Sequence, residues 1–144
     1  MYARTAGQRN RDEQRGTLLC LTGDYLSKGW TAKARVCATE FWPMAKRFTL
    51  QAEWADRAAH LAALEQRPQD ALQLLGYAEA AVAAMGKRRQ PQGQRQAERV
   101  ERLAMAAWGA SADPQEAARL KVCGGLLQAA DLFARGLAAA PPAA

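Results

Sequence analysis

Histidine and cysteine are scarce in this chain of 144 residues, which contains one histidine and three widely separated cysteines. Cys20, Cys37 and Cys123 form no C-x-x-C pair, so their spacing indicates neither a disulfide framework nor a thiolate metal site. A zinc or metalloprotease motif needs several converging ligands, and no H-E-x-x-H pattern is present. We therefore expect no metal, no cofactor and no catalytic residue, and we interpret the protein as non-enzymatic.

The single histidine, His60, is expected to be a surface or partly buried residue of a helix. Glu53 and Asp56 precede it in helical register, which favours a local ion pair. A cysteine nucleophile acting with His60, from Cys20 or Cys123, is the catalytic alternative. Cys37 falls among apolar residues at helical spacing and is expected to be a small buried hydrophobe.

Long apolar runs and strand patterns are also missing. No stretch approaches the roughly 18 apolar residues of a membrane span, and the basic, polar start lacks the apolar region of a signal peptide. We therefore expect a cytoplasmic protein that does not enter membranes. No run rich in Val, Ile and Thr alternates like a strand, and much of the 49% hydrophobic content is alanine, which favours helix. The sequence predicts an all-α protein.

Acidic residues are too few to balance the basic ones. Asp and Glu number 14 against 20 Lys and Arg, so the formal net charge is +6. In the densest basic region, three residues follow i, i+4, i+7 spacing and so share one helix face. They are Arg95, Arg99 and Arg102. This face is either a phosphate-contacting surface or a solvated helix face, and the solvated face is favoured. The region consists of Lys87, Arg88, Arg89, Arg95, Arg99 and Arg102.

Two apolar stripes repeat at one spacing and predict two amphipathic helices. Each member of the second stripe follows its counterpart by thirty-seven residues (71 minus 34, 85 minus 48). A helical repeat of this length is typical of stacked hairpins. The first stripe is Ala34, Cys37, Ala38, Phe41, Met44, Ala45 and Phe48, and the second is Ala71, Leu74, Leu75, Ala78, Ala81, Val82 and Met85.

Periodicity and capping residues predict helices over residues 12–27, 30–48, 51–65, 68–85, 94–108, 116–122 and 126–137. Pro43 should kink or break the second of these helices. The last helix is expected to bury Leu126, Ala130, Phe133 and Leu137. We expect a disordered segment over residues 1–10, a single helical-repeat domain over 11–138 and a flexible tail over 139–144.

Three stretches resemble a known bacterial family. They are Trp-Ala-Asp at 54–56, His-Leu-Ala-Ala-Leu-Glu at 60–65 and Leu-Leu-Gly-Tyr-Ala-Glu-Ala at 74–80. Together with the basic loop at 87–91, the arginine-rich helix at 95–108 and the Gly-Gly at 124–125, they resemble the extreme C-terminal region of multidomain winged-helix transcriptional regulators. Those proteins carry a predicted signal-transduction ATPase and tetratricopeptide-like C-terminal repeats. The resemblance covers residues 28–138.

The chain departs from those regulators in what it lacks. It has no winged helix and no phosphate-binding G-x-x-x-x-G-K-[ST] loop, so no DNA-binding or ATP-binding residue carries over. Cys123 also stands where the family pattern commonly has an acidic residue. The chain is therefore an excised module, a remnant of a longer gene or a free-standing relative.

These observations predict an array of about two degenerate tetratricopeptide-like hairpins closed by C-terminal capping helices. Because roughly three repeats are usually needed for stability, the capping helices or a second subunit in a homodimer must supply the missing cover. The predicted function is a protein-interaction or sensory scaffold in signal transduction and transcription regulation. Its partner would be a protein, a peptide or adjoining regulator domains, with Trp30, Trp42 and Tyr77 as candidate anchors. The alternative is a small basic nucleic-acid-binding module that uses the basic region.

Overall fold

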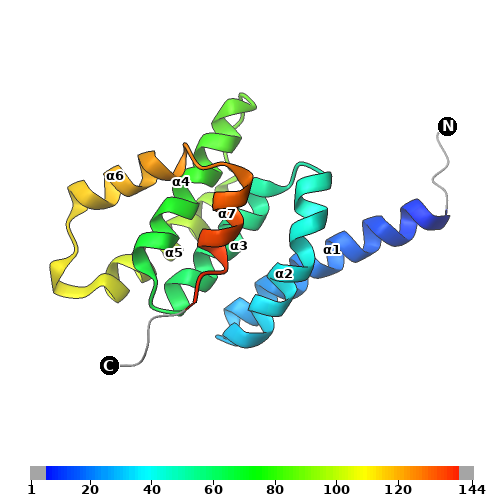
Figure 1. Ribbon diagram of the computed structural model, residues 1–144, viewed down its shortest axis with the longest axis horizontal. Helices are drawn as coiled ribbons and strands as arrows, with labels where there is room; N and C mark the ends of the chain where they lie inside the picture. The colour runs from blue at the N-terminus through cyan, green and yellow to red at the C-terminus, as the bar shows by residue number, and fades with distance from the viewer. Residues whose placement is uncertain (1–5, 140–144) are drawn as a thin grey trace.

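The computed structural model describes the backbone of residues 6–139 and the side chains of residues 16–139. This part of the chain is all helical, as predicted (Figure 1). Its seven α-helices are α1 (Ala6–Ser27), α2 (Thr31–Arg47), α3 (Gln51–Leu64), α4 (Pro68–Ala84), α5 (Pro91–Trp108), α6 (Pro114–Gly124) and α7 (Ala129–Gly136), with a 3-10 turn at Gly109–Ser111.

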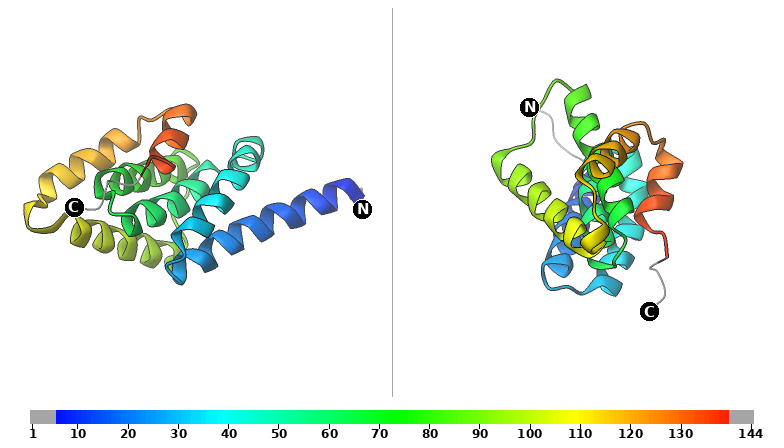
Figure 2. Two further views of the ribbon diagram at one scale, coloured as in Figure 1. Left: turned by 60° about the horizontal axis from the view of Figure 1, so that its bottom comes forward. Right: turned by 90° about the vertical axis from the view of Figure 1, so that its left-hand side faces the viewer.

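The helices pack as antiparallel pairs in sequence order. Helix α3 lies between α2 and α4 and packs against both, and α4 also packs against α5 and α6. The first part of α1 projects away from the other helices, which is clearest in the left view of Figure 2. The two apolar stripes lie on α2 and α4 and are largely buried, although Met85 at the end of the second stripe is 55% exposed. Both stripes therefore meet α3, which lies between their two helices.

Helix α3 is the centre of the fold, because α1, α2, α4, α5 and α7 all pack against it. Alanines make this possible, since their small side chains allow neighbouring helices to approach on several sides. Its largest core side chain is Trp54, whose indole Nε1 donates a 2.9 Å hydrogen bond to the carbonyl of Ala38 in α2. The fully buried alanines of α3 are Ala55, Ala58, Ala59 and Ala62.

Helices α4 and α6 cross at two glycines. A Cβ on Gly76 would overlap the carbonyl oxygen of Lys121, and a Cβ on Gly124 would overlap the carbonyl oxygen of Gln73. The two backbones therefore touch directly, as they can only where side chains are absent. Gly124 is the last residue of α6 and Gly125 follows as its C-cap, so the helix ends at the two glycines, two residues beyond the predicted end at 122.

Helix α7 returns to cover an aromatic cluster between α2 and α3. The rings of Trp42 and Trp54 lie 4.6 Å apart between centroids, and the ring of Phe133 from α7 lies 5.3 Å from that of Trp42. Gly136 packs directly on the Trp54 ring, where a Cβ would overlap it. A C-terminal helix thus covers this side of the core.

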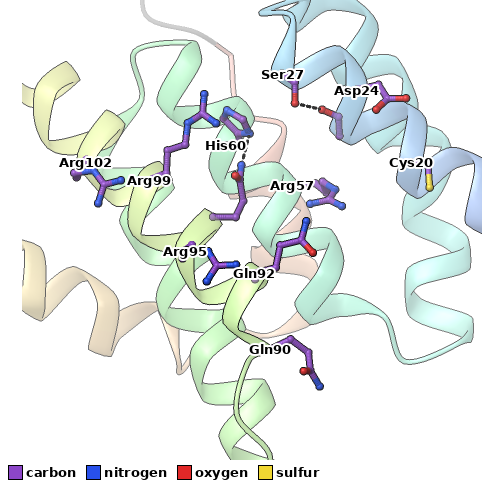
Figure 3. A pocket seen from close by; sticks show the side chains of 13 residues that line it. Cys20, Asp24, Ser27, Arg57, His60, Gln90, Gln92, Arg95, Arg99 and Arg102 are labelled. Atoms are coloured by element: carbon purple, nitrogen blue, oxygen red, sulfur yellow. Dashed lines mark hydrogen bonds between the residues drawn. The ribbon is translucent and has the colours of Figure 1, made fainter.

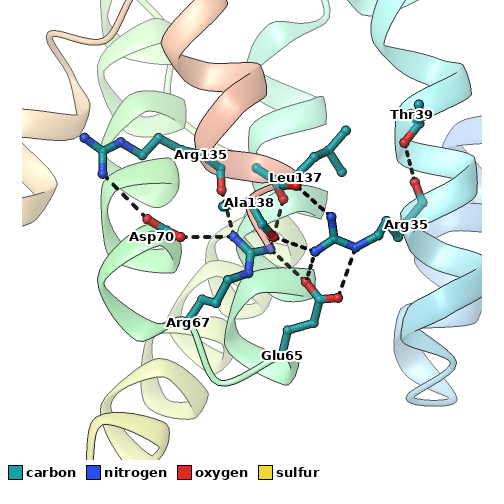
Figure 4. Close-up of polar contacts among 9 residues, drawn as sticks. Arg35, Thr39, Glu65, Arg67, Asp70, Arg135, Leu137 and Ala138 are labelled. Atoms are coloured by element: carbon teal, nitrogen blue, oxygen red, sulfur yellow. Dashed lines mark hydrogen bonds and ion pairs between the residues drawn. The ribbon is translucent and has the colours of Figure 1, made fainter. Parts of the chain in front are cut away.

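Two arginines hold the end of α7 in place (Figure 4). Arg67 donates hydrogen bonds of 2.7 and 3.0 Å to the carbonyls of Arg135 and Gly136. Arg35 donates to the carbonyls of Leu137 and Ala138, both at 2.7 Å. Glu65 pairs with both guanidinium groups and balances part of their charge. Cations at the C-terminal end of a helix satisfy its free carbonyls and oppose its dipole.

The observed helix boundaries correct the expected start of the first helix and the expected break at Pro43. Helix α1 begins at Ala6, six residues before the predicted start, so residues 6–10 of the expected disordered segment are helical. Residues 1–5 and 140–144 lie outside the described chain. Helix α2 also continues through Pro43. Pro43 and Thr39 are both exposed, so the Thr39 carbonyl that loses its partner can face water.

The predicted buried face of the last helix was wrong for two of its four residues. Leu126 is 78% exposed and precedes α7, and Ala130 is exposed, whereas Leu132 is fully buried. Phe133 and Leu137 are partly buried against the core. The prediction placed Leu126 on the helix, but residues 125–128 form the turn before it. The buried face therefore begins at a different residue.

We predict that Gly124→Ala lowers the free energy of unfolding by about 2 kcal/mol or more, because the new Cβ forces α4 and α6 apart. Gly16→Ala is the matched control, since no atom lies within 4 Å of a Cβ at that helical position. That change should leave stability equal or raise it by about 0.5–1 kcal/mol. Urea unfolding followed by circular dichroism measures both, and equal midpoints for the two variants would contradict the direct backbone contact.

Candidate functional site

A groove of about 840 Å³ lies between α1, α3 and the start of α5 (Figure 3). Figure 3 shows the α1 residues Cys20, Asp24 and Ser27 on one side, the arginines of α5 on the other, and residues of α3 between them. We call this hollow the arginine groove, after Arg57, Arg95, Arg99 and Arg102, four of its lining residues. Its other lining residues are Cys20, Gly23, Asp24, Ser27, His60, Gln90, Gln92, Gly93 and Gln96.

The α5 wall carries the three arginines whose spacing predicted a shared face. Arg95, Arg99 and Arg102 are exposed and line the same groove, so that expectation is confirmed. None of the three forms an ion pair or hydrogen bond with another residue of the described chain. Their guanidinium groups are therefore available to a ligand.

Arg57 of α3 joins these arginines and was not singled out by the sequence. Its guanidinium packs on Gly23 of α1, where a Cβ would lie 3.4 Å from the Arg57 Nε. This Nε is buried without a hydrogen-bond partner. The signal was present, since Arg57 precedes His60 by three residues and so shares its helix face. The glycine inside α1 marks the place where the guanidinium approaches.

His60 lies beside the arginines, and only 6% of its surface is exposed. Burial, together with the smaller effect of the positive charges of Arg99 and Arg57, lowers the pKa of His60 to about 4. The Gln96 Nε2 lies 3.4 Å from the His60 Nδ1, which accepts a hydrogen bond in the neutral tautomer that carries its proton on Nε2. His60 is therefore neutral at pH 7.

The predicted partner of His60 was wrong, because Asp56 pairs with Arg89. The Arg89 Nη2 lies 2.7 Å from the Asp56 Oδ1, and its Nη1 lies 3.4 Å from the Glu79 Oε1. Burial raises the pKa of Asp56, although the Arg89 charge beside it acts in the opposite direction. These pairs tie the α4–α5 loop to α3 and α4, and so they position the start of α5 at the groove.

The structure separates the remaining basic candidates from the arginine groove. The Arg89 side chain is only 7% exposed and is occupied by two carboxylates, so its predicted role in phosphate contact is corrected to a structural one. Lys87 and Arg88 line a different hollow beside Val82 and Ala83. The six predicted basic residues thus divide into a groove set of three, an exposed pair and a buried loop anchor.

The predicted aromatic anchors do not share a surface. Trp30 is 46% exposed at the α1–α2 turn, with the Nζ atoms of Lys28 and Lys33 at 4.6 and 4.9 Å from its ring centroid. Trp42 is buried in the aromatic cluster, so its predicted role as an exposed anchor was wrong. Tyr77 is partly buried against the core, and burial raises its pKa.

The groove is suited to binding anions. Of its lining residues, four are arginines and one, Asp24, is a carboxylate. A guanidinium donates two parallel hydrogen bonds to a carboxylate or a phosphate, and like charges gathered in a hollow strengthen the attraction. Helix α5 also begins at the groove without a side-chain cap or an acidic residue in its first turn, so its dipole adds to the positive potential.

Other chemistry finds less support. Within residues 16–139, no group of three or more His, Cys, Asp or Glu side chains is arranged to hold a metal ion. None of the described helices is long and apolar enough to cross a bilayer.

No family model, curated protein or solved structure matches the chain significantly.

We predict that stability falls as the pH drops from 6.5 towards 4, because His60 must stay neutral in the folded chain. The folded pKa of about 4 lies below the ordinary value of 6.5, so the unfolded chain binds more protons between these values. The loss should be roughly 1–2 kcal/mol between pH 7 and pH 5.

The measurement is urea unfolding at several pH values for the natural chain and for His60→Gln. The variant should show a flatter dependence above pH 5, where most carboxylates stay ionised. The same slope in both proteins would show that His60 does not titrate in this way.

Proposed function

We propose that this protein is a non-enzymatic helical scaffold that binds an acidic segment of a partner protein in the arginine groove. We further propose that it is a tetratricopeptide-like C-terminal module, or a free-standing relative, of bacterial winged-helix regulators, and that it works in the cytoplasm. The thirty-seven-residue repeat of the stripes on α2 and α4, and the sequential antiparallel packing, support the repeat-type scaffold. The residues at 54–56, 60–65 and 74–80 support the kinship.

One observation carries the binding proposal: four arginines line one hollow without a carboxylate partner in the described chain. Buried arginines elsewhere in the fold have carboxylate partners. Arg67 and Arg89 are nearly buried, and each is paired with two carboxylates. Four unpaired guanidinium groups in one groove repel each other, and an anionic ligand relieves that cost.

The competing function is nucleic-acid binding, which the net charge of +6 and the exposed arginines of α5 favour. Two features support the protein partner instead. The volume of about 840 Å³ lies in the range of sites that enclose small ligands or short segments. No Phe, Tyr or Trp is among the lining residues, whereas single-stranded nucleic acids are usually held by stacking on such rings.

We expect Arg95→Gln/Arg99→Gln to weaken binding of fluorescent polyglutamate by about tenfold or more, because two charge-assisted pairs are lost. Lys87→Gln/Arg88→Gln is the matched control, since it removes the same charge outside the groove. Fluorescence anisotropy at about 150 mM salt measures both variants.

The same titration with a duplex DNA decides between the two functions. Binding of duplex at micromolar concentration or tighter at about 150 mM salt, lost in the groove variant, would assign the groove to nucleic acid. Equal losses in the two double variants would mean that polyglutamate responds only to net charge. Either result would overturn the proposed function.

A further inference from the structure

We infer that the acidic segment binds in an extended conformation, with its carboxylates at alternate residues facing α5 and small uncharged side chains facing α1. This inference rests on the proposed function and specifies the ligand of the same groove. It follows from three properties of the lining: its amide and hydroxyl groups, the unequal charge of its two walls, and the spacing of the arginines.

The first property is the supply of neutral hydrogen-bonding groups. Gln90 and Gln92 line the groove with side-chain amides that both donate and accept hydrogen bonds. Neither amide is engaged with another residue in the described structure. An extended peptide exposes unpaired backbone N–H and C=O groups that need both kinds of partner, whereas a phosphate backbone mainly needs donors. The lining therefore fits a peptide main chain.

The second property is the difference between the two walls. The α5 wall carries Arg95, Arg99 and Arg102, whereas the α1 wall carries Cys20, Gly23, Asp24 and Ser27. The Ser27 hydroxyl donates to the carbonyl of Gly23 at 3.0 Å and keeps its oxygen as an acceptor. Asp24 would repel a carboxylate placed against α1. The α5 wall is therefore basic, and the one carboxylate that lines the groove, Asp24, lies on the α1 wall.

The third property is the spacing along α5. Arg95 and Arg99 are four residues apart, which corresponds to about 6 Å of helix rise. In an extended segment, side chains two residues apart point to the same side and lie about 6.6–6.8 Å apart. Alternate carboxylates can therefore meet successive arginines, while the residues between them point to the opposite wall. Three consecutive carboxylates would place one against Asp24.

Arg57 provides the fixed point between the walls. Its guanidinium is packed on Gly23, and its Nε is buried, so less side-chain freedom is lost when a ligand binds. It lies on α3, between the α1 residues and the α5 arginines (Figure 3). A carboxylate entering the groove can therefore pair with Arg57 as well as with an arginine of α5.

The test compares two labelled peptides of identical composition and charge with the full chain. One contains three Glu-Ser repeats, and the other contains three Glu followed by three Ser, both capped at their ends. We expect the alternating peptide to bind about five- to tenfold more tightly at ~50 mM salt. Asp24→Asn should reduce this preference by admitting a carboxylate at the α1 wall. His60 is the only histidine in the sequence, so its ring signals in NMR spectra report occupation of the groove.

Each outcome has a distinct meaning. A clear preference for the alternating peptide, with shifted His60 signals, supports the inference. Equal binding of both peptides, weakened by Arg95→Gln/Arg99→Gln, would overturn the extended alternating arrangement and leave the proposed function standing. Binding of neither peptide, or binding that leaves the His60 signals unchanged, would overturn both. Single-stranded DNA that binds more tightly than either peptide, with this binding lost in Arg95→Gln/Arg99→Gln, would assign the groove to nucleic acid.

Discussion

The whole fold depends on one helix that is enclosed by five others. Helix α3 can be surrounded in this way because six of its nine buried residues are alanine, which allows close approach of neighbouring helices. Trp54 then fills the space that the alanines leave, with its indole N–H satisfied by α2. A larger residue at one of the fully buried alanines would force a neighbouring helix away from α3. The arrangement of α1, α5 and α7 around α3 thus follows from small side chains at its centre.

The polar residues of α3 hold the α4–α5 loop in place and line part of the arginine groove. Asp56 is paired with Arg89 and holds the α4–α5 loop, so the loop fixes where α5 starts. Arg57 and His60 have no such carboxylate partner among the described residues, and they lie where α1 and α5 leave a groove. The neutral state of His60 is a consequence of this placement, because burial and two guanidinium groups oppose its protonation. One helix therefore supplies both the structural ion pair and part of the candidate site.

The sequence predicted the helices well and their long-range contacts poorly. Periodicity and capping residues are local, so the start of α4 at Pro68 agrees with the predicted proline in the first helical turn. Helix α5 begins at Pro91, three residues before the predicted start at 94, because Pro91 was assigned to the loop. The burial of Trp42 depends on Phe133, which lies ninety-one residues later (133 minus 42) and reaches it only through the return of α7. Arg89 appeared to belong to an exposed basic run because its partners, Asp56 and Glu79, lie on other helices. The direct contact at Gly76 and Gly124 is likewise invisible in either helix alone.

The difference between local patterns and contacts between helices also explains why only part of the candidate site was predictable. The shared face of Arg95, Arg99 and Arg102 is a property of one helix and follows from spacing alone. The α1 wall and Arg57 come from other helices, so the sequence could identify a basic face but not a groove. The groove changes the electrostatics of that face, because charges arranged around a hollow act together on one ligand. An isolated basic helix face favours any polyanion, whereas a groove with one basic wall and Asp24 opposite can select among anions by shape and by the position of their charges.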